Sequence, residues 1–231
     1  MAIMDMYDKI SAAIDKREFA VGVFIDLSKA FDTLNHAILL KKLEHYGVRG
    51  IALKLLKNYL SNRFQYVFLN DTSSRLKLIS CGVPQGSILG PLLFLIYIND
   101  IVNCSSIMKF ILFADDTNLF LSDEDLSRLM ISLNAELSKL SDWFKSNKLS
   151  LNVKKTNYII FGRKNLPKLH SPFKLFIDGN ALEQVDNTKF LGMYIDSKLS
   201  WSIHIDHIAF KISEGIGIMG RLRGILPSNI C

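Results

Sequence analysis

Cysteine is scarce in this sequence, and so are uninterrupted apolar runs. The three cysteines, Cys81, Cys104 and Cys231, form neither a CxxC pattern nor an even set. We therefore expect neither disulfides nor structural zinc, and an intracellular setting in the nucleus or the cytoplasm. The longest apolar stretch, residues 88–101, is interrupted by polar and helix-breaking residues and is shorter than the ~20 residues that a membrane span needs. The sequence predicts no membrane partner.

The sequence also lacks internal repeats and low-complexity tracts, and 49% of its residues are hydrophobic. This composition is sufficient for a large core and excludes a disordered chain. Asp5 and Asp8 interrupt the first residues, where a secretory signal requires an apolar run. We expect a globular intracellular protein, and the sequence does not indicate its oligomeric state.

Acidic residues are nearly missing from one part of the chain. Nine of the 28 basic residues lie between Lys139 and Lys174, where Asp142 is the only acid, and the other segments hold 19 basic and 21 acidic residues. The net charge of +6 is therefore located in this segment, as expected of a protein that binds a phosphate backbone. A solvated surface is the alternative. The candidate nucleic-acid-binding residues are Lys145, Lys148, Lys154, Arg163 and Lys164.

The hydrophobic pattern predicts helices and strands mixed along the chain. Helices are expected at 4–17, 34–46, 49–60, 87–102, 124–148 and 203–222, with Asp32 or Thr33 capping the second and Ser122 or Asp123 the fifth. Strands are expected at 19–26, 64–69, 75–80, 109–114, 117–121, 158–161, 173–177 and 189–195. This mixture with hairpins indicates an α+β fold, an antiparallel sheet with helices on one face.

Two adjacent aspartates, Asp115 and Asp116, lie between two short apolar runs that are typical of a β-hairpin. Neighbouring carboxylates repel each other unless one takes up a proton or both meet a cation. Mg²⁺ is a natural partner because it prefers carboxylate oxygens and completes its shell with water and substrate phosphates. An ordinary turn is the alternative, since aspartate also favours turns.

Asp26 is the third acid of interest because it stands at the end of an apolar strand, where an unpaired charge is costly. If this strand lies beside the hairpin, Asp26 and Asp115 converge. Two metal ions ~3.5–4 Å apart, held by such acids, suit an in-line displacement at phosphorus. A helix-capping role is the alternative for Asp26, although Asp32 is better placed for it.

A Pro- and Gly-rich loop, residues 82–91, lies between these acids in the sequence. Its glycines allow the backbone to approach a ligand closely, and the helix predicted from Ser87 would point its positive N-terminus toward that ligand. Gln85 can donate a hydrogen bond to a sugar or a base. A simple turn that caps a core helix is the alternative.

Segments 24–32, 82–87 and 113–116 occur in the order and spacing of a reverse transcriptase palm. The chain resembles most closely the enzyme of non-LTR (LINE-type) retrotransposons. Segment 149–156 resembles that family's next palm motif, and 189–195 resembles its primer-gripping hairpin. The resemblance covers residues 1–200 and implies a polymerase palm with a ferredoxin-like sheet. It leaves 201–231 as a partial thumb, and the fingers are largely missing.

The resemblance implies roles for individual residues. Asp26 and Asp115 would bind two Mg²⁺ ions, with Mn²⁺ as a possible substitute, and Asp116 would support them. Phe31 would exclude a ribose 2′-hydroxyl, a core aromatic being the alternative. The remaining residues are Gln85, Gly86 and Ser87 in the nucleotide pocket, Lys155 as proton donor with Lys154 as its rival, and Leu191 and Gly192 under the primer terminus.

The function implied by the resemblance is RNA-templated DNA synthesis, with an RNA template, a DNA primer and dNTPs as partners. Few residues precede Asp26, so we expect a fragment with weak or no activity alone. Two alternatives stay open. One is a catalytically dead relict that binds nucleic acid, and the other is an RNA-dependent RNA polymerase on the same palm, against which Phe31 argues.

Overall fold

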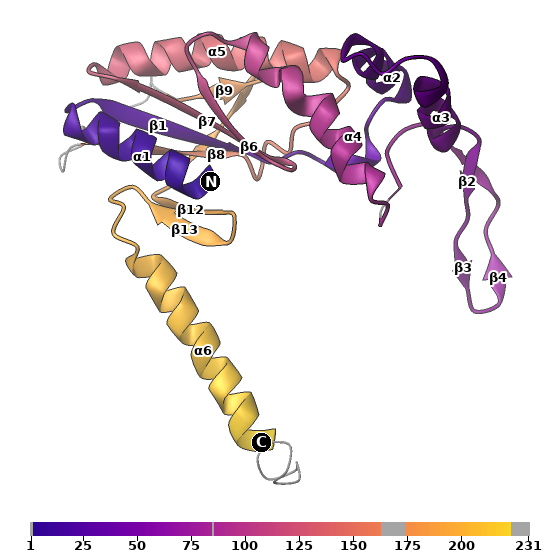
Figure 1. Ribbon diagram of the computed structural model, residues 1–231. Coiled ribbons are helices and arrows are strands. Elements are labelled where there is room, and N and C mark those ends of the chain that lie inside the picture. The colour runs from indigo at the N-terminus through magenta and orange to yellow at the C-terminus, as the bar shows by residue number, and fades with distance from the viewer. Residues whose placement is uncertain (1, 85, 163–173, 223–231) are drawn as a thin grey trace.

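The centre of the fold is a five-stranded sheet with the strand order β11-β8-β1-β7-β6 (Figure 1). The structure is a computed structural model and describes residues 2–84, 86–162 and 174–222. The strands are β1 (Phe19–Ile25), β6 (Lys109–Phe113), β7 (Asp116–Asp123), β8 (Asn157–Phe161) and β11 (Glu183–Gln184). β1 is antiparallel to both of its neighbours, β7 and β8, and only the short β11 pairs in parallel.

The central strand β1 has no polar side chain, and both of its faces are covered. Its sequence Phe-Ala-Val-Gly-Val-Phe-Ile is buried from the second residue onward. Alternate residues point to opposite faces of a strand, so Val21 and Val23 enter one core while Ala20 and Phe24 enter another. A strand of this kind requires packing partners on both sides of the sheet.

Helices therefore cover both faces of the sheet. The larger core packs α5 (Leu126–Ser146), α4 (Leu89–Ile98) and α2 (His36–His45) on one face. On the other face lie α1 (Ala2–Asp15), which inserts Met6 and Ile10, and the hairpin of β12 (Asn187–Phe190) and β13 (Met193–Asp196). The α+β class is confirmed, but the expectation of helices on one face was wrong because β1 has two apolar faces.

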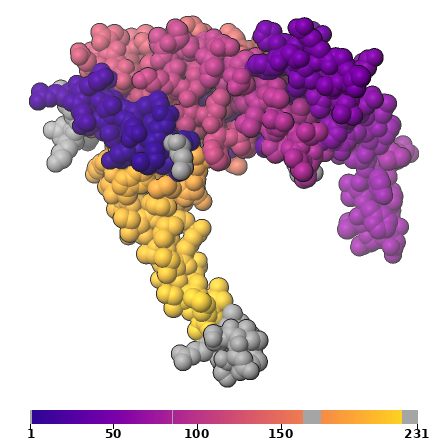
Figure 2. Space-filling model, in the orientation of Figure 1, coloured from indigo at the N-terminus to yellow at the C-terminus, as the bar shows by residue number. Residues whose placement is uncertain are grey.

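Two parts of the chain project from this body (Figures 1 and 2). One follows α3 (Gly50–Leu60) and consists of β2 (Arg63–Gln65), β3 (Phe68–Leu69), β4 (Thr72–Ser73) and β5 (Lys77–Ile79). The other is α6 (Ser202–Leu222), which follows β13. The short elements η1 (Ala30–Asp32), η2 (Asn99–Cys104), β9 (Phe176–Ile177) and β10 (Asn180–Ala181) complete the described chain.

Several predicted boundaries need correction. Asn35 caps α2 and Asp125 caps α5, each accepting a hydrogen bond from the backbone three residues later. The expected strand 189–195 is a hairpin that turns at Leu191 and Gly192. The expected helix 87–102 is α4 followed by the 3₁₀ helix η2. Such shifts at element ends reflect side-chain and backbone bonds that a hydrophobic pattern does not encode.

None of the helices within the described residues is both long enough and apolar enough to cross a membrane.

Candidate active site

The strand register brings three aspartates to one end of the sheet. Ile25, the last residue of β1, pairs with Thr117 of β7, so Asp26 and Asp116 are the next residues on neighbouring strands. Phe113 pairs with Asp116, and the hairpin turn is therefore Ala114–Asp115, with Ala114 at a φ of +51°. The turn was predicted at Asp115–Asp116, whereas Asp116 is the first residue of β7.

The three carboxylates interact electrostatically. Burial raises the pKa of Asp116, and the nearby charges of Asp115 and Asp26 raise it further. Asp115 and Asp26 are therefore close enough to Asp116 to disfavour its negative charge, which is the situation that a bound cation relieves. This convergence was the condition on which the metal hypothesis rested.

Carboxylate oxygens are the donors that Mg²⁺ prefers, so these residues fit the ion by chemistry. Within residues 2–84, 86–162 and 174–222, no group of three or more His, Cys, Asp or Glu side chains stands ready to hold a metal. In enzymes of phosphate chemistry, Mg²⁺ usually takes few ligands from the protein. One or two carboxylates hold the ion there, and substrate phosphates and water complete its shell.

The segment after α5 holds Asp26 in place. The Asp26 amide donates to the Thr156 hydroxyl at 3.3 Å, and the Asn152 amide donates to the Asp26 carbonyl at 2.9 Å. Thr156 in turn donates its hydroxyl hydrogen to the Asn152 carbonyl at 3.0 Å. No role for Thr156 is evident from the sequence. A threonine beside an exposed lysine pair was a weak signal, and its complete burial became visible only in the fold.

The two candidate proton donors lie on this same segment. Lys154 and Lys155 are both exposed, and the Lys155 amide donates to the Asn152 carbonyl at 3.0 Å. Lys154 lines a hollow with Ser28 and Glu183. The fold thus places the segment that carries both lysines beside Asp26. The choice of Lys155 over Lys154 stays a prediction.

Phe31 has two environments. One side of its ring packs on Phe94, with ring centroids 4.8 Å apart, as the core alternative implied. Phe31 also lines a hollow of about 350 Å³ together with Gly86, Ser87 and Gly90. The ring is therefore both anchored in the core and presented to a cavity.

Backbone bonds attach the 82–84 loop to the Phe31 segment. The Val83 amide donates to the Phe31 carbonyl at 2.9 Å, and the Gly82 amide donates to the Leu34 carbonyl at 2.8 Å. Gly82 has a φ of +80°, and a Cβ there would lie 2.6 Å from the Asp32 carbonyl oxygen. Only glycine fits this position without displacing the backbone.

Ser87 belongs to the hollow and also to the start of α4. Its hydroxyl accepts a hydrogen bond from the Leu89 amide at 3.2 Å and from the Tyr59 hydroxyl at 2.5 Å. The helix begins at Leu89, two residues later than predicted. Gln85 lies outside the described residues. Tyr59, at the end of α3, was missed because its partner is 28 residues away.

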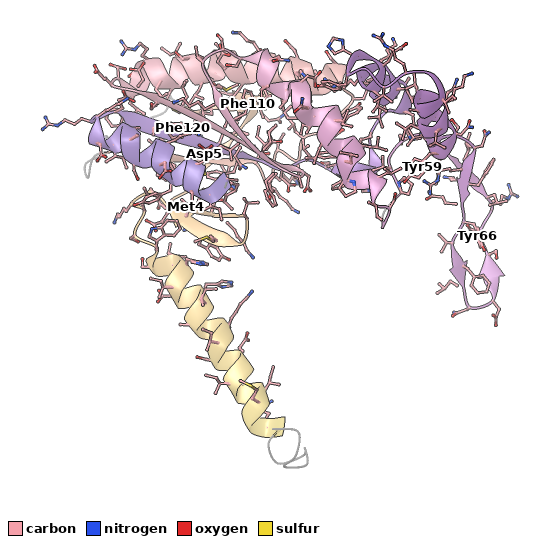
Figure 3. The ribbon with its side chains drawn as sticks, viewed as in Figure 1. Met4, Asp5, Tyr59, Tyr66, Phe110 and Phe120 are labelled. Atoms are coloured by element: carbon pink, nitrogen blue, oxygen red, sulfur yellow. The ribbon has the colours of Figure 1, made fainter. Side chains whose placement is uncertain are left out.

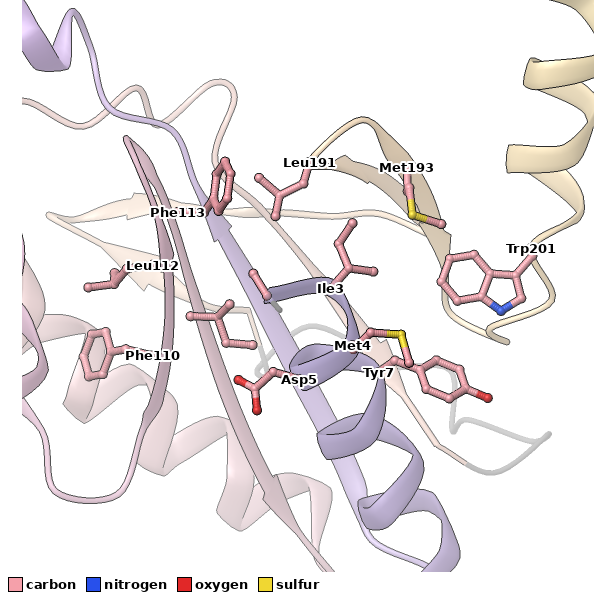
Figure 4. A pocket seen from close by; sticks show the side chains of 12 residues that line it. Ile3, Met4, Asp5, Tyr7, Phe110, Leu112, Phe113, Leu191, Met193 and Trp201 are labelled. Carbon is pink, nitrogen blue, oxygen red and sulfur yellow. The ribbon is translucent and has the colours of Figure 1, made fainter. Parts of the chain in front are cut away.

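Leu191 and Gly192 form the two-residue turn of the β12–β13 hairpin. Their φ values of +48° and +86° are those of a type I′ turn. Leu191 lines a hollow of about 1140 Å³ with Phe113, Met193 and Trp201. Figure 4 shows Leu191 and Phe113 on the walls of this hollow. The predicted primer-gripping turn therefore lies near the strand that leads to Asp115.

The candidate basic residues are not equally available. Lys145 pairs with Asp178, whose hydrogen bond raises the lysine pKa. Lys148 and Lys154 are exposed. Arg163 and Lys164 lie outside the described residues. The ion pair of Lys145 competes with phosphate binding at that position, and its role stays a prediction.

The family model of "Reverse transcriptase (RNA-dependent DNA polymerase)" matches residues 3–195. Among curated proteins, the "Probable RNA-directed DNA polymerase from transposon BS" of Drosophila melanogaster is 32% identical over 85% of this chain and 22% of that protein. The "RNA-directed DNA polymerase from mobile element jockey" of the same organism is 27% identical over 94% of this chain and 24% of its own length. This chain thus spans about a quarter of these relatives.

Solved structures of telomerase are similar in fold. An apo telomerase from Candida tropicalis superimposes with a TM-score of 0.57 at 12% identity, covering 87% of this chain and 39% of that chain. A telomerase from Candida albicans gives a TM-score of 0.54 at 16% identity, covering 85% of this chain and 33% of that chain. These similarities confirm the palm-like α+β fold.

The family model and the curated relatives confirm the resemblance to non-LTR retrotransposon enzymes. The chain belongs to the reverse transcriptase family.

Proposed function

We propose that this chain forms the catalytic centre of an RNA-templated DNA polymerase that uses the two-metal mechanism. The 3′-hydroxyl oxygen of a DNA primer attacks the α-phosphorus of a dNTP, the bond from that phosphorus to the bridging oxygen breaks, and pyrophosphate leaves. The observation that carries the proposal is the convergence of Asp26, Asp115 and Asp116 at one end of adjacent strands.

The chain's own residues would position the metal ligands. Asp26 and Asp115 would offer carboxylate oxygens to Mg²⁺, with Mn²⁺ as a substitute, and Asp116 would support them. Bound divalent cations neutralise charge on the phosphate oxygens and on the attacking and leaving oxygens. The backbone bonds from Asn152 and Thr156 hold Asp26 before substrate arrives, which reduces the reorganisation that the reaction requires.

The hollow beside Phe31 would receive the sugar and base of the incoming nucleotide. Gly86 and Ser87 line it together with Phe31, whose ring is held by Phe94. A ring fixed in this way would collide with a ribose 2′-hydroxyl and favour deoxynucleotides. Gln85 would contribute a hydrogen bond to the same pocket.

Lys155 would give a proton to the leaving pyrophosphate, with Lys154 as the alternative donor. A general acid of this kind typically contributes ~10²–10⁴-fold to the rate. The turn at Leu191 and Gly192 would lie beneath the primer terminus, since Leu191 and Phe113 line one hollow.

We expect weak or no polymerisation by this chain alone. The side chains that line the Phe31 hollow within the described residues include no lysine or arginine, so a triphosphate would lack cationic partners there. The chain also spans only about a quarter of its curated relatives. The activity of a whole polymerase is therefore proposed for the longer protein, with this part as its catalytic centre.

Primer extension tests the proposal directly. The purified chain is incubated with Mg²⁺, poly(rA) annealed to oligo(dT), and dTTP, and the products are resolved on a gel. Little extension is expected. Robust extension that disappears in Asp115→Asn would support the site and refute weak activity, whereas extension undiminished in both Asp26→Asn and Asp115→Asn would refute the site.

Nucleotide binding provides a readout that does not depend on turnover. We expect Mg²⁺-dependent binding of dTTP to the chain on poly(rA)–oligo(dT), weakened at least tenfold in Asp115→Asn and unchanged in the control Asp206→Asn on α6. UTP that binds as tightly as dTTP would favour an RNA-dependent RNA polymerase. Template binding without any Mg²⁺-dependent nucleotide binding would favour a relict that only binds nucleic acid.

A further inference from the structure

The hairpin arm, residues 61–80, has no packing partner on the sheet. Its strands pair only with each other, β2 with β5 and β3 with β4, and with no strand of the five-stranded sheet. Figure 1 shows the arm extending from α3 at one end of the molecule, while α6 extends from the other end on the same side. An isolated two-stranded hairpin is only marginally stable in water, so its exposed surface requires an explanation.

The arm exposes an unusual number of apolar and aromatic side chains. Those more than half exposed are Phe64, Tyr66, Val67, Phe68, Leu69, Leu76 and Leu78. Figure 3 shows the arm with Tyr66 labelled on it. Contiguous exposed apolar groups of this kind mark interaction surfaces. The aromatic rings are of special interest because every nucleic-acid base can stack on a ring.

The arm is also basic. It carries Arg63, Arg75 and Lys77 against a single acid, Asp71. None of the ion pairs found within the described part of the chain involves these three cations. Arg75 and Lys77 are exposed and Arg63 is half-buried. Cations beside exposed rings complement a phosphate backbone whose bases are unpaired.

Near the root of the arm, the strand register places the basic side chains and the apolar side chains on opposite faces. Gln65 and Lys77 are cross-strand partners and lie on the same face as Arg63, whereas Phe64 and its partner Leu78 lie on the opposite face. A nucleic-acid strand could therefore place phosphates on one side of the arm and bases on the other.

The root of the arm is connected to the candidate nucleotide pocket. Tyr59 lies two residues before the arm, and its hydroxyl donates to Ser87, which lines the Phe31 hollow. The Arg63 guanidinium lies over the Tyr59 ring, 5.9 Å from its centroid. A strand leaving the pocket along this path would next reach the arm.

We propose that the arm binds single-stranded nucleic acid, with bases stacked on Tyr66 and Phe68 and phosphates held by Arg63, Arg75 and Lys77. The assignment of this strand to the template ahead of the catalytic centre rests on the proposed function. Binding of a single strand does not.

The test uses the full chain and fluorescence anisotropy with labelled twelve-nucleotide oligo(U) and oligo(dT). The variant Tyr66→Leu/Phe68→Leu keeps the surface apolar and removes the rings. Since stacking on an aromatic ring stabilises by ~1–3 kcal/mol per base, we expect affinity to fall about fivefold or more for each ring removed. The control Phe210→Leu removes an exposed ring from α6 and should bind like the wild type.

A second variant, Arg63→Gln/Arg75→Gln/Lys77→Gln, tests the binding of phosphates. The slope of log K against log salt should become shallower by about 0.7 for each phosphate of a single strand that the variant no longer neutralises. Lys211→Gln on α6 is the matched control. All arm variants should melt at the wild-type temperature, because the arm strands pair with no part of the main sheet.

Wild-type affinity in the double leucine variant, or no binding of either oligonucleotide by the wild type, would overturn the proposal. Self-association of the wild type that survives the leucine substitutions, with unchanged strand binding, would identify the arm as a protein-docking surface instead. Preference for oligo(U) or oligo(dT) separates RNA from DNA. Arm-dependent binding retained in Asp26→Asn, without extension by any form, would leave the arm standing and count against the proposed function.

Discussion

The backbone amide of Asp26 donates a hydrogen bond to the side-chain hydroxyl of Thr156, 3.3 Å away and 130 residues later in the chain. Thr156 is fully buried and donates its own hydroxyl hydrogen to the Asn152 carbonyl. The position of the first candidate metal ligand therefore depends on a segment that follows both the β6–β7 hairpin and helix α5 in the chain.

Thr156→Val should destabilise the fold. The substitution keeps the side-chain shape but leaves the Asp26 amide without its acceptor, and an unmade buried hydrogen bond costs ~1–3 kcal/mol. Urea unfolding followed by circular dichroism measures the change in unfolding free energy.

Thr117→Val is the matched control for this experiment. Thr117 is also fully buried, but its hydroxyl has no hydrogen-bond partner among the described residues. Its replacement should be neutral or stabilising by up to ~1 kcal/mol. Equal losses in the two valine variants would contradict the bond to Asp26 as the cause.

Asp116→Asn should stabilise the protein at neutral pH in the absence of divalent cations. The folded-state pKa of Asp116 is raised by burial and by the charges of Asp115 and Asp26, so the ionised carboxylate opposes folding. After a discount for solvent screening at a partly exposed site, we expect a melting temperature higher by ~1–2 °C. The gain should shrink as the pH falls and wild-type Asp116 becomes protonated.

Added Mg²⁺ should reverse this order, because a cation at the site stabilises the wild type more than Asp116→Asn. Asp123→Asn is expected to change the stability in the opposite direction. The hydrogen bond from Arg128 lowers the pKa of Asp123, so its neutralisation should destabilise at neutral pH. Differential scanning fluorimetry with and without Mg²⁺ distinguishes the two variants, and an Asp116→Asn variant that melts below the wild type without metal counts against the coupling.

Asp196 should make the start of α6 sensitive to acid. Burial alone would raise its pKa, but hydrogen bonds from the Ser200, Lys198 and Trp201 amides and from the Ser200 hydroxyl prevail and lower it. A lowered folded-state pKa stabilises the protein above the unfolded value of about 3.9. This stability is lost as the pH falls through the folded-state pKa.

The variant Asp196→Asn should therefore be less stable than the wild type above about pH 5, and the difference should vanish toward lower pH as the wild-type carboxylate is protonated. Urea midpoints measured across this range provide the test. Asp206→Asn, an exposed residue on α6, is the control. A constant difference between wild type and Asp196→Asn at every pH would show that ionisation is not involved.

Gly82→Ala should damage the Phe31 hollow. Its Cβ would lie 2.6 Å from the Asp32 carbonyl oxygen at a φ of +80°, and the Val83 bond to Phe31 would be disturbed. Left-handed strain costs ~1–2 kcal/mol and overpacking adds ~1–3 kcal/mol. We expect a total loss of ~2–5 kcal/mol in unfolding free energy by urea denaturation.

Gly86→Ala separates the cost of left-handed backbone strain from the cost of overpacking. Gly86 has a similar φ of +78°, but a Cβ there meets no atom within 4 Å. Only the strain term of ~1–2 kcal/mol applies. If the two alanine variants lose equal stability, the close approach between Gly82 and Asp32 is not what restricts this position.

Much of the secondary structure could be predicted because its signals are local. The apolar stripe of α5 and the apolar run of β1 identified both elements to within a few residues. The caps Asn35 and Asp125 were missed. Several polar residues near each helix start could serve as caps, and the choice depends on how the preceding chain enters the helix.

Some residues of the candidate site could likewise be recognised from local sequence, and others could not. Asp26, Asp115 and Asp116 were identified from sequence because they stand at the ends of apolar segments in a recognisable order. Thr156 and Tyr59 were not, since each acts through a partner distant in the sequence. No local pattern encodes such a pair.

The sequence by itself determined most of the helices and strands, the α+β class and the choice of Asp26, Asp115 and Asp116 as candidate ligands, because periodicity and residue type are properties of short segments. The tertiary structure alone decided that both faces of the sheet are covered, that the hairpin turns at Ala114–Asp115, and that Thr156 bonds to Asp26. These features arise from strand register and packing, in which residues far apart in the chain compete for the same buried space and the same hydrogen-bonding groups.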